Sequence, residues 1–273
     1  MDPLQSIVLG FIQGTTEWLP VSSTAHLRLV ELFFGLAVTP LFNLVLHLGT
    51  VAVLLFYFRV EVKNGLVSLV RLDFKSEWGM LIPRIVVATI PTAAIGLFYD
   101  LFLTNPHSSL YLSSLDTLPA IGATFLIGAT IVFSTKFGKE DQTGLPYKFV
   151  IIMGIAQGFA IFPGLSRSGV TISTALMLGL QRQKAFKFSF LLSIPAVLGD
   201  LAVETYAQRG ELAAATVGIS LLDIAAAIVT TVIVGYFAIK LVARVVQGKK
   251  FHWFAFYTWT LGAALLIYMF LIH

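Results

Sequence analysis

Long apolar stretches alternate with short polar ones along most of the chain. Helices that cross a bilayer need about 20 predominantly apolar residues, and six stretches approach or exceed that length. They run from Leu41 to Phe58, Leu81 to Leu101, Leu118 to Phe133, Ala185 to Val203, Thr216 to Ile239 and Phe251 to Ile272. This pattern predicts an all-α, polytopic membrane protein with six transmembrane helices.

Two further apolar segments, 4–36 and 149–180, carry polar residues near their centres. Glu17 and Pro20 interrupt the first segment, and Arg167 lies within the second. An acidic or basic residue at the centre of a lipid-facing helix costs about 2.5–3.5 kcal/mol on insertion scales. Broken helices are tolerated at membrane depth where protein surrounds them. We therefore expect each segment to form a re-entrant, broken-helix hairpin.

The composition agrees with a membrane protein. The chain is 57% hydrophobic and 12% charged, with a mean hydropathy of +0.88, whereas soluble domains carry about 25% charged residues. The polar stretches are too short to build a core of their own, so residues 1–273 are expected to form one membrane domain. The absence of cysteine excludes disulfides, thiol catalysis and cysteine metal sites. The net charge of +4 is spread over loops and predicts no nucleic-acid partner.

The basic residues indicate the orientation. Of the 18 lysines and arginines, 15 lie in four loops, 59–84, 136–148, 181–187 and 240–250. Loops rich in lysine and arginine stay on the cytoplasmic side. This asymmetry predicts that the C-terminus is outside, that the first hairpin enters the membrane from outside, and that the second enters from inside.

The two broken segments resemble one another. Gly10–Gly14 parallels Gly154–Gly158, and Leu19–Ser23 parallels Phe162–Ser166 with a slip of one residue. Three spans follow each segment, so the halves 1–137 and 145–273 are expected to be inverted-topology repeats. Such repeats bring broken helices together near the midplane, where positive helix ends face an anion. The alternative is a chance similarity of two glycine-rich apolar stretches.

The second broken segment contains a run typical of a phosphate-binding site. Proline and glycine at 163–164 end one helix, and Ser166 or Ser168 can cap the next. Free N–H groups at the new helix end, the hydroxyls up to Thr171 and the Arg167 guanidinium all donate hydrogen bonds. The alternative is an ordinary helix cap whose arginine pairs with a nearby acid.

The first broken segment contains candidate catalytic groups. Gln13 and Glu17 are four residues apart and share a helix face. After Pro20 a new helix is expected to begin near Ser22 or Ser23, which places Ser23 and His26 on one face. A serine hydroxyl beside an imidazole is the minimum for an activated nucleophile. Ser22 and Thr24 are expected to add phosphate contacts, and Glu17 could orient the histidine, act as a base, or hold a divalent cation with Gln13.

Simpler interpretations of these residues remain open. Glu17 could form an ion pair with Arg28 or Arg167, and His26 could be a buried, hydrogen-bonded imidazole. For His47 we favour a structural hydrogen bond. Asp200 and Asp223 are expected to pair with each other or with a backbone group.

These motifs resemble those of the undecaprenyl-diphosphate phosphatase family of the bacitracin-resistance type. The resemblance rests on Gln13–His26, on Pro163–Thr171 and on Leu46–Thr50, and it extends over nearly the whole chain. It implies hydrolysis of undecaprenyl diphosphate to undecaprenyl phosphate, the lipid carrier of bacterial cell-wall synthesis. It also implies two re-entrant hairpins, homodimers in many members, and a site that opens to the outer face of the bacterial plasma membrane.

The resemblance also implies roles for individual residues. Ser23 matches the nucleophile and His26 its activator. Glu17 matches an acidic residue that supports catalysis through a divalent cation, Mg²⁺ or Ca²⁺. Ser166 and Arg167 match the phosphate-binding pair. The chain departs from the family pattern at two positions: Gln13 stands where some members carry a second glutamate, and Ala25 where glycine is common.

Two other functions fit parts of the pattern. Inverted repeats with broken helices are typical of transporters, so a lipid flippase or transporter is the main alternative. The serine–histidine pair beside an arginine favours an enzyme, because transport alone needs no nucleophile. An intramembrane serine protease fits less well, because the serine clusters lack the Gly-x-Ser-x-Gly motif.

Overall fold

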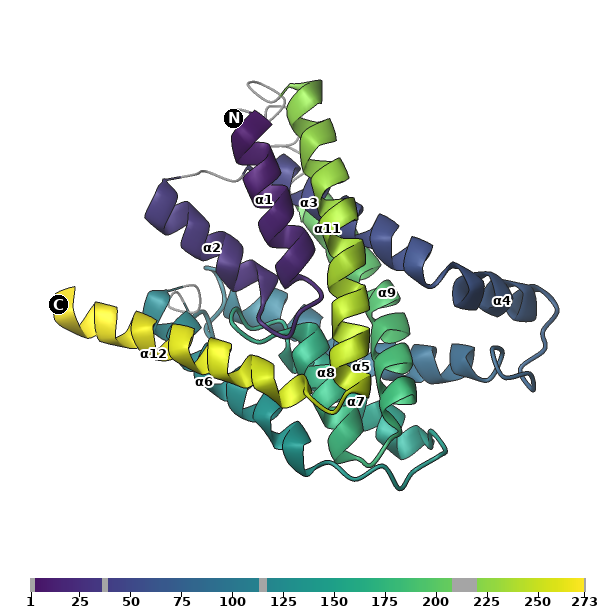
Figure 1. Cartoon of the computed structure of the whole chain (residues 1–273). Helices are drawn as coiled ribbons and strands as arrows, with labels where there is room; N and C mark the ends of the chain where they lie inside the picture. The colour runs from purple at the N-terminus through teal and green to yellow at the C-terminus, as the bar shows by residue number, and fades with distance from the viewer. Residues whose placement is uncertain (1–2, 36–38, 113–116, 208–219, 273) are drawn as a thin grey trace.

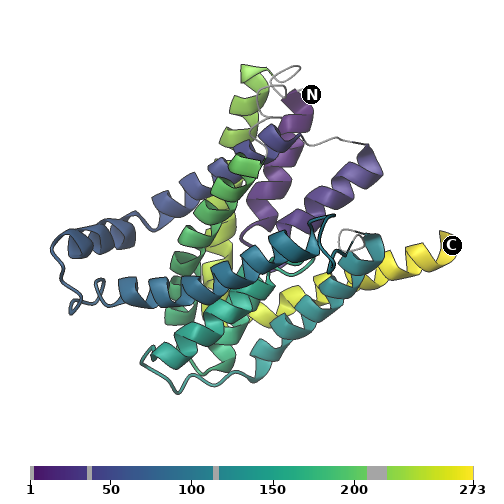
Figure 2. The same cartoon turned by 180° about the vertical axis from the view of Figure 1, so that it is seen from behind.

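The computed structural model describes residues 3–35, 39–112, 117–207 and 220–272, and within these ranges the chain is helical with no strand. The first half contains α1 (Pro3–Thr16), α2 (Ser23–Phe34), α3 (Pro40–Tyr57), α4 (Arg59–Val70), α5 (Leu81–Phe98), a π-helical turn η1 (Tyr99–Leu103), α6 (Leu118–Ser134) and a 3₁₀ turn η2 (Thr135–Phe137). The second half contains α7 (Tyr147–Phe159), α8 (Arg167–Met177), α9 (Arg182–Ala207), α11 (Leu221–Gln247), a 3₁₀ turn η3 (Phe251–Trp253) and α12 (Phe254–Ile272). Figures 1 and 2 show the arrangement from two sides.

The predicted multi-span architecture is confirmed. Within the described ranges, five helical stretches are long and apolar enough to cross a membrane: 81–103, 118–137, 182–206, 221–247 and 251–271. A sixth span results if α3 and α4 are counted together, although they are bent by 79° where the charged sequence begins at Arg59. The expected start of the fifth span at Thr216 lies outside the described residues.

Both interrupted segments are pairs of short helices, as predicted. The chain breaks between α1 and α2 around Pro20, and between α7 and α8 around Pro163. The longest of these four helices, α1, has 14 residues and is therefore only about 21 Å long, less than the ~30 Å hydrocarbon core. None of the four can cross the membrane alone.

Glycines allow each first hairpin helix to lie close to a long neighbour. A Cβ atom at Gly10 would lie 2.7 Å from a carbonyl oxygen of α11, and one at Gly154 would lie 2.2 Å from a carbonyl oxygen of α5. Such small-residue contacts are the usual way for membrane helices to approach closely. Helix α1 thus packs along α11, α7 along α5, and α6 along α12 (Figures 1 and 2). An inverted repeat predicts such a pattern, and the repeat of 1–137 and 145–273 stays a prediction.

Three predicted loops are partly helical. Helix α4 occupies residues 59–70, α9 begins at Arg182 inside the expected loop 181–187, and α11 continues to Gln247. Lysine and arginine are good helix formers whose charged ends can reach the interface from a helix. Hydropathy therefore marks where the apolar stretch ends and not where the helix ends.

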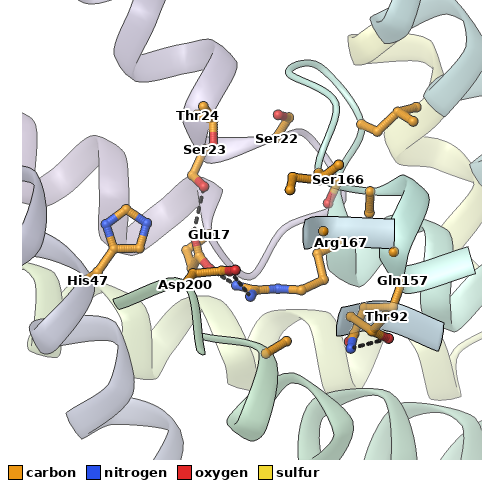
Figure 3. A pocket seen from close by; sticks show the side chains of 16 residues that line it. Glu17, Ser22, Ser23, Thr24, His47, Thr92, Gln157, Ser166, Arg167 and Asp200 are labelled. Carbon is orange, nitrogen blue, oxygen red and sulfur yellow. Dashed lines mark hydrogen bonds and ion pairs between the residues drawn. The ribbon is translucent and has the colours of Figure 1, made fainter. Parts of the chain in front are cut away.

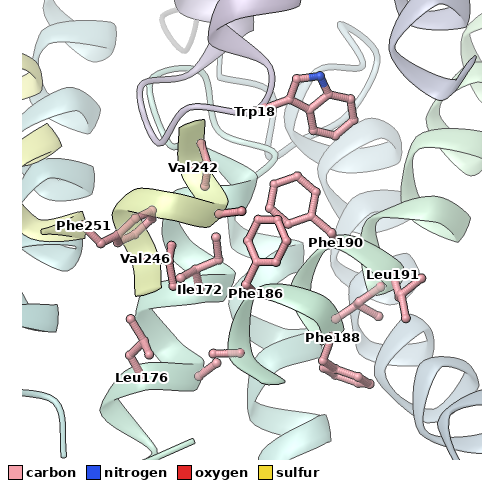
Figure 4. Close-up of a cluster of buried hydrophobic side chains, with 14 of the residues drawn as sticks. Trp18, Ile172, Leu176, Phe186, Phe188, Phe190, Leu191, Val242, Val246 and Phe251 are labelled. Carbon is pink, nitrogen blue, oxygen red and sulfur yellow. The ribbon is translucent and has the colours of Figure 1, made fainter. Parts of the chain in front are cut away.

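A cluster of buried side chains packs under the first hairpin and fixes its turn. Trp18 is 2% exposed and stacks on Phe190 with ring centroids 5.6 Å apart. Phe186, Ile172 and Val242 continue this cluster onto α9, α8 and α11 (Figure 4). Because Trp18 follows Glu17 directly, this packing also fixes the backbone that carries the Glu17 carboxylate.

Candidate active site

The two hairpin turns contact each other directly, as predicted. The backbone N–H of Gly164 donates to Ser22 Oγ at 3.2 Å, and Ser166 Oγ donates to the carbonyl oxygen of Leu19 at 3.2 Å. Arg167 of the second hairpin forms an ion pair with Glu17 of the first. Segments about 140 residues apart in the sequence therefore form one site (Figure 3).

Local backbone geometry explains how each turn presents its side chains. Ser22 has a φ of 69°, and α2 begins at the next residue. Gly164 has a φ of 95°, and a Cβ there would lie 2.0 Å from Thr124 Oγ1, so the turn requires glycine. Ser166 caps α8 by accepting a hydrogen bond from the N–H of Gly169 at 3.2 Å. Of the two serines predicted as caps, Ser166 therefore takes that role.

Glu17 is the centre of the site. Its side chain is 4% exposed. Oε1 accepts from Arg167 Nη2, while Oε2 accepts from Ser23 Oγ at 2.6 Å and from Gln13 Nε2 at 3.2 Å. Of the two ion-pair partners left open for Glu17, the structure contains Arg167. Arg28 instead pairs with Glu31 at 2.9 Å. Through Glu17, the predicted nucleophile and the predicted phosphate-binding arginine come together.

These groups open onto a cavity of about 180 Å³. Of the predicted site residues, Glu17, Ser22, Ser23, Thr24, Ser166 and Arg167 line it. Four polar residues to which the sequence analysis gave no place in the site also line it, namely His47, Thr92, Gln157 and Asp200. The rest of the wall consists of small or apolar residues, including Gly96, Gly158, Ile161, Leu165 and Ala196. A polar end beside an apolar wall is suited to an amphiphilic ligand.

Asp200 is the most informative of the added residues. Its Oδ2 lies 3.6 Å from Arg167 Nη1, so the guanidinium lies between two carboxylates. Of the two partners expected for Asp223, the structure contains the backbone group and not Asp200: Asp223 Oδ2 accepts from the N–H of Ser220 at 2.9 Å, in a capping box at the start of α11. The sequence signal for Asp200 was an acidic residue inside an otherwise apolar predicted span.

The predicted serine–histidine pair is not formed. His26 Nδ1 lies 2.7 Å from the carbonyl oxygen of Ser22, and Nε2 lies 2.7 Å from the hydroxyl of Tyr257. The imidazole also stacks on Tyr257 and packs edge-on against Phe125. These contacts hold the ring away from the cavity, and Ser23 donates to Glu17 instead. Of the two interpretations, the hydrogen-bonded imidazole describes His26 better, although the ring is half-buried and not fully buried.

Ser168 and Thr171 also lie away from the main cavity. Ser168 Oγ contacts the Leu19 carbonyl oxygen at 3.4 Å and Ser166 Oγ at 3.1 Å, and Thr171 Oγ1 donates to the Arg167 carbonyl oxygen at 2.8 Å. Their prediction as phosphate contacts is not supported, because their hydroxyls complete the hydrogen bonding of the turn and helix. Ser166 and Arg167 remain the cavity-facing members of this motif. His47 forms the expected structural bond, with Nδ1 2.9 Å from the carbonyl oxygen of Asn43.

The structure does not place Gln13 beside Glu17 as a second cavity-facing ligand for a cation. Gln13 is completely buried, turns its amide nitrogen toward Glu17 and does not line the cavity. In the described part of the chain no three histidine or acidic side chains form a metal cluster. Glu17 and Asp200 are instead the two carboxylates on the cavity wall. Mg²⁺ in proteins is usually bound by one or two carboxylates together with phosphate oxygens of a bound ligand and water. The carboxylates of Glu17 and Asp200 therefore fit a cation that binds together with a phosphate-containing ligand.

Fold and site together define a polytopic membrane protein in which two broken helices build a polar cavity around a buried carboxylate–arginine pair. The family model described as bacitracin resistance protein BacA matches residues 6–264, and the chain belongs to that family. The resemblance identified from the motifs is thereby confirmed.

Similar proteins cover the full length of the chain. A protein of Carboxydothermus hydrogenoformans is 39% identical over 98% of this chain and 97% of its own length. A protein of Desulfosudis oleivorans is 38% identical over 97% and 98% of the two chains, and one of Methanobrevibacter smithii is 34% identical over 96% of each. All three are named undecaprenyl-diphosphatase.

Proposed function

We propose that this protein is an integral membrane phosphatase that hydrolyses undecaprenyl diphosphate to undecaprenyl phosphate and inorganic phosphate. The observation that carries the proposal is the contact of Ser23 and Arg167 with the same Glu17 carboxylate at the edge of one cavity. The full-length similarity to proteins named undecaprenyl-diphosphatase supports the substrate. In this proposal the polyprenyl tail lies among the membrane helices and the diphosphate enters the cavity.

Arg167 is the proposed phosphate-binding group. A guanidinium can bind two phosphate oxygens at once, and a preorganised cation in a dry site is the main source of rate acceleration in phosphoryl transfer. The hydroxyls of Ser22 and Thr24 line the same cavity and can donate further hydrogen bonds, whereas the hydroxyl hydrogen of Ser166, which also lines the cavity, is donated to the Leu19 carbonyl oxygen. Arg167 uses Nη2 for Glu17 and has Nη1 near Asp200, so the rest of its five N–H donors can bind the phosphate.

Ser23 is the proposed nucleophile and Glu17 its base. In this step Ser23 Oγ bonds to the terminal phosphorus, its proton passes to Glu17, and the bond to the bridging oxygen breaks to release undecaprenyl phosphate. Water then hydrolyses the phosphoserine to free phosphate. The 2.6 Å hydrogen bond from Ser23 to Glu17 supports this assignment in place of His26. Glu17 could equally activate a water for direct attack, and the experiment below distinguishes the two routes.

The charge of the cavity supports a divalent cation. With Glu17 and Asp200 ionised and Arg167 protonated, the cavity wall has an excess of negative charge before an anionic diphosphate enters. A cation held by these two carboxylates and by the substrate would neutralise the oxygens of the transferred group. We therefore propose Mg²⁺ or Ca²⁺ as cofactor, with Glu17 and Asp200 as its protein ligands.

The location of the site is also a proposal. The loops rich in basic residues favour an orientation in which the first hairpin enters from outside. With this orientation the cavity faces the outer side of a bacterial plasma membrane. The predicted homodimer stays a prediction that follows from the resemblance.

Phosphate release from detergent-solubilised protein tests the function. Undecaprenyl diphosphate should yield phosphate without any membrane gradient, a chelator should stop the reaction, and Arg167→Ala should be inactive while still folded. A flippase would release no phosphate, and that result from a folded protein would refute the proposal. Rapid quenching with labelled substrate should trap label on Ser23, whereas full activity without label would establish direct attack by water.

A further inference from the structure

Two basic residues near the end of α11 pair with none of the carboxylates that the structure describes. Lys240 and Arg244 are four residues apart, so they lie on one helix face. Neither forms an ion pair with any carboxylate in the parts of the chain that the structure describes, and Lys240 Nζ lies over the ring of Tyr236 at 4.4 Å. By contrast, Lys187 pairs with Glu61 at 3.4 Å. The two cations are therefore free to bind an anion from outside the chain.

These cations border an open groove of about 460 Å³. Its walls are Thr15 and Leu19 at the turn of the first hairpin and Val234, Phe237, Ala238 and Leu241 on α11. Phe237 and Leu241 are 64% and 46% exposed, so the helix offers an uncovered apolar strip beside its two cations.

The hairpin explains why this space exists. Helix α1 covers α11 where Gly10 and Gly14 pack against it, and the chain then turns back at residues 17–22. Helix α11 continues beyond that turn (Figure 1). From Val234 to Arg244 it rises by about 15 Å, roughly the thickness of one leaflet's hydrocarbon. A hairpin that enters from one side thus leaves hydrocarbon volume beneath its turn, and a lipid chain can fill that volume.

We propose that this groove binds one anionic phospholipid of the bilayer. Its acyl chain lies along Val234, Phe237 and Leu241, and its phosphate headgroup contacts Lys240 and Arg244. Charge complementarity selects this occupant, because the groove offers an apolar wall that ends in two cations without carboxylate partners. Basic pockets between membrane helices bind anionic headgroups in this way. The site is distinct from the catalytic cavity, since the two share none of their lining residues.

Lipid titration of the purified full-length chain tests the proposal. Native mass spectrometry in detergent should show bound phosphatidylglycerol in preference to phosphatidylcholine. The variant Lys240→Gln/Arg244→Gln should weaken phosphatidylglycerol binding by about 25-fold, which is about five-fold for each basic residue near an anionic lipid. The control is Lys249→Gln/Lys250→Gln, which removes the same charge just beyond the groove, including the ion pair of Lys249 with Glu140 at 3.7 Å, and should change binding by less than about two-fold. Phosphatase activity in detergent should be unchanged in both variants, which also verifies folding.

Several results would overturn the proposal. Equal losses in the groove variant and the control would show that charge attracts lipid without a site. Equal binding of phosphatidylglycerol and phosphatidylcholine would show that the groove does not recognise an anionic headgroup. Displacement of phosphatidylglycerol by undecaprenyl phosphate at much lower concentration would assign the groove to the isoprenoid. If the groove variant changed only the ratio of monomer to dimer, a second copy of the chain would be the occupant.

Discussion

Removal of the Arg167 guanidinium should separate its structural role from its chemical one. Arg167→Ala leaves the Glu17 carboxylate, whose side chain is 4% exposed, with only the hydrogen bonds from Ser23 and Gln13. Loss of one partner of a buried ion pair costs about 3–5 kcal/mol. Because the Arg167 side chain is 20% exposed, water can partly replace it, and we expect about 3 kcal/mol. For a chain of this size that lowers Tm by roughly 6–12 °C.

The double variant Glu17→Gln/Arg167→Ala removes both charges and should recover most of that Tm loss. Thermal unfolding in one detergent, with phosphate release measured on the same samples, is the assay. We expect both variants to be inactive, but only Arg167→Ala to be markedly less stable. If Arg167→Ala matched the wild type in Tm, or the double variant were no more stable than the single one, the buried pair would not contribute as the geometry indicates. Activity in the double variant would refute the catalytic role of both residues.

Four further outcomes are expected. Ser23→Ala should lower kcat by at least about 10³-fold if the serine is the nucleophile, and a smaller loss in single-turnover assays would favour direct water attack. His26→Gln should lower kcat without moving the pH profile of turnover, because the imidazole holds the hairpin in position; loss of one limb of that profile would make His26 the base. Gly154→Val should destabilise by about 1–3 kcal/mol through overpacking against α5, and an unchanged Tm would contradict the close helix contact. Burial alone would raise the pKa of Glu140, but hydrogen bonds from Arg182 hold that pKa below its ordinary value. The stability that the Glu140–Arg182 contact contributes is therefore present at neutral pH, and it is lost as the pH falls through the lowered pKa. Unfolding measured between about pH 3 and 6 should therefore show a shallower acid-side decline in Arg182→Gln than in the wild type, and parallel declines would exclude the pair as a cause.

The broken helices were predictable because their cause is local. Proline and glycine at the turns, with Glu17 and Arg167 in apolar surroundings, cannot continue a lipid-facing helix whatever the rest of the chain does. The convergence of the hairpins followed from the similarity of the two segments, because inverted repeats bring broken helices together near the midplane. The sequence left the partner of Glu17 open between Arg28 and Arg167, and the fold shows that it is Arg167.

The side-chain partners were less predictable because they depend on contacts between distant elements. Helical spacing placed Ser23 and His26 on one face, but Tyr257, from the last helix, supplies a hydroxyl and a ring that draw His26 away. For Asp200 the sequence showed only an acidic residue within a predicted span, and the fold shows that it lies beside Arg167. Periodicity gives the face of a helix, and only packing determines which neighbour that face meets.

Several residues of the two sequence motifs bond the hairpin turns to each other as well as lining the site, which explains why both motifs are long. The break after α1 exposes the carbonyl of Leu19, and Ser166 and Ser168 of the other hairpin bond to it at 3.2 and 3.4 Å. Conversely, the N–H of Gly164 in the second turn is satisfied by Ser22 of the first. The Leu19 carbonyl oxygen also accepts from the N–H of Val21 at 2.8 Å, so it has a partner within its own turn. An unpaired backbone group in hydrocarbon costs several kcal/mol, so the second turn needs the first to satisfy the N–H of Gly164. The hydroxyls of Ser22, Ser166 and Ser168 thus close the turns, and in the proposed function Ser23, Glu17 and Arg167 on the wall of the cavity act on the ligand.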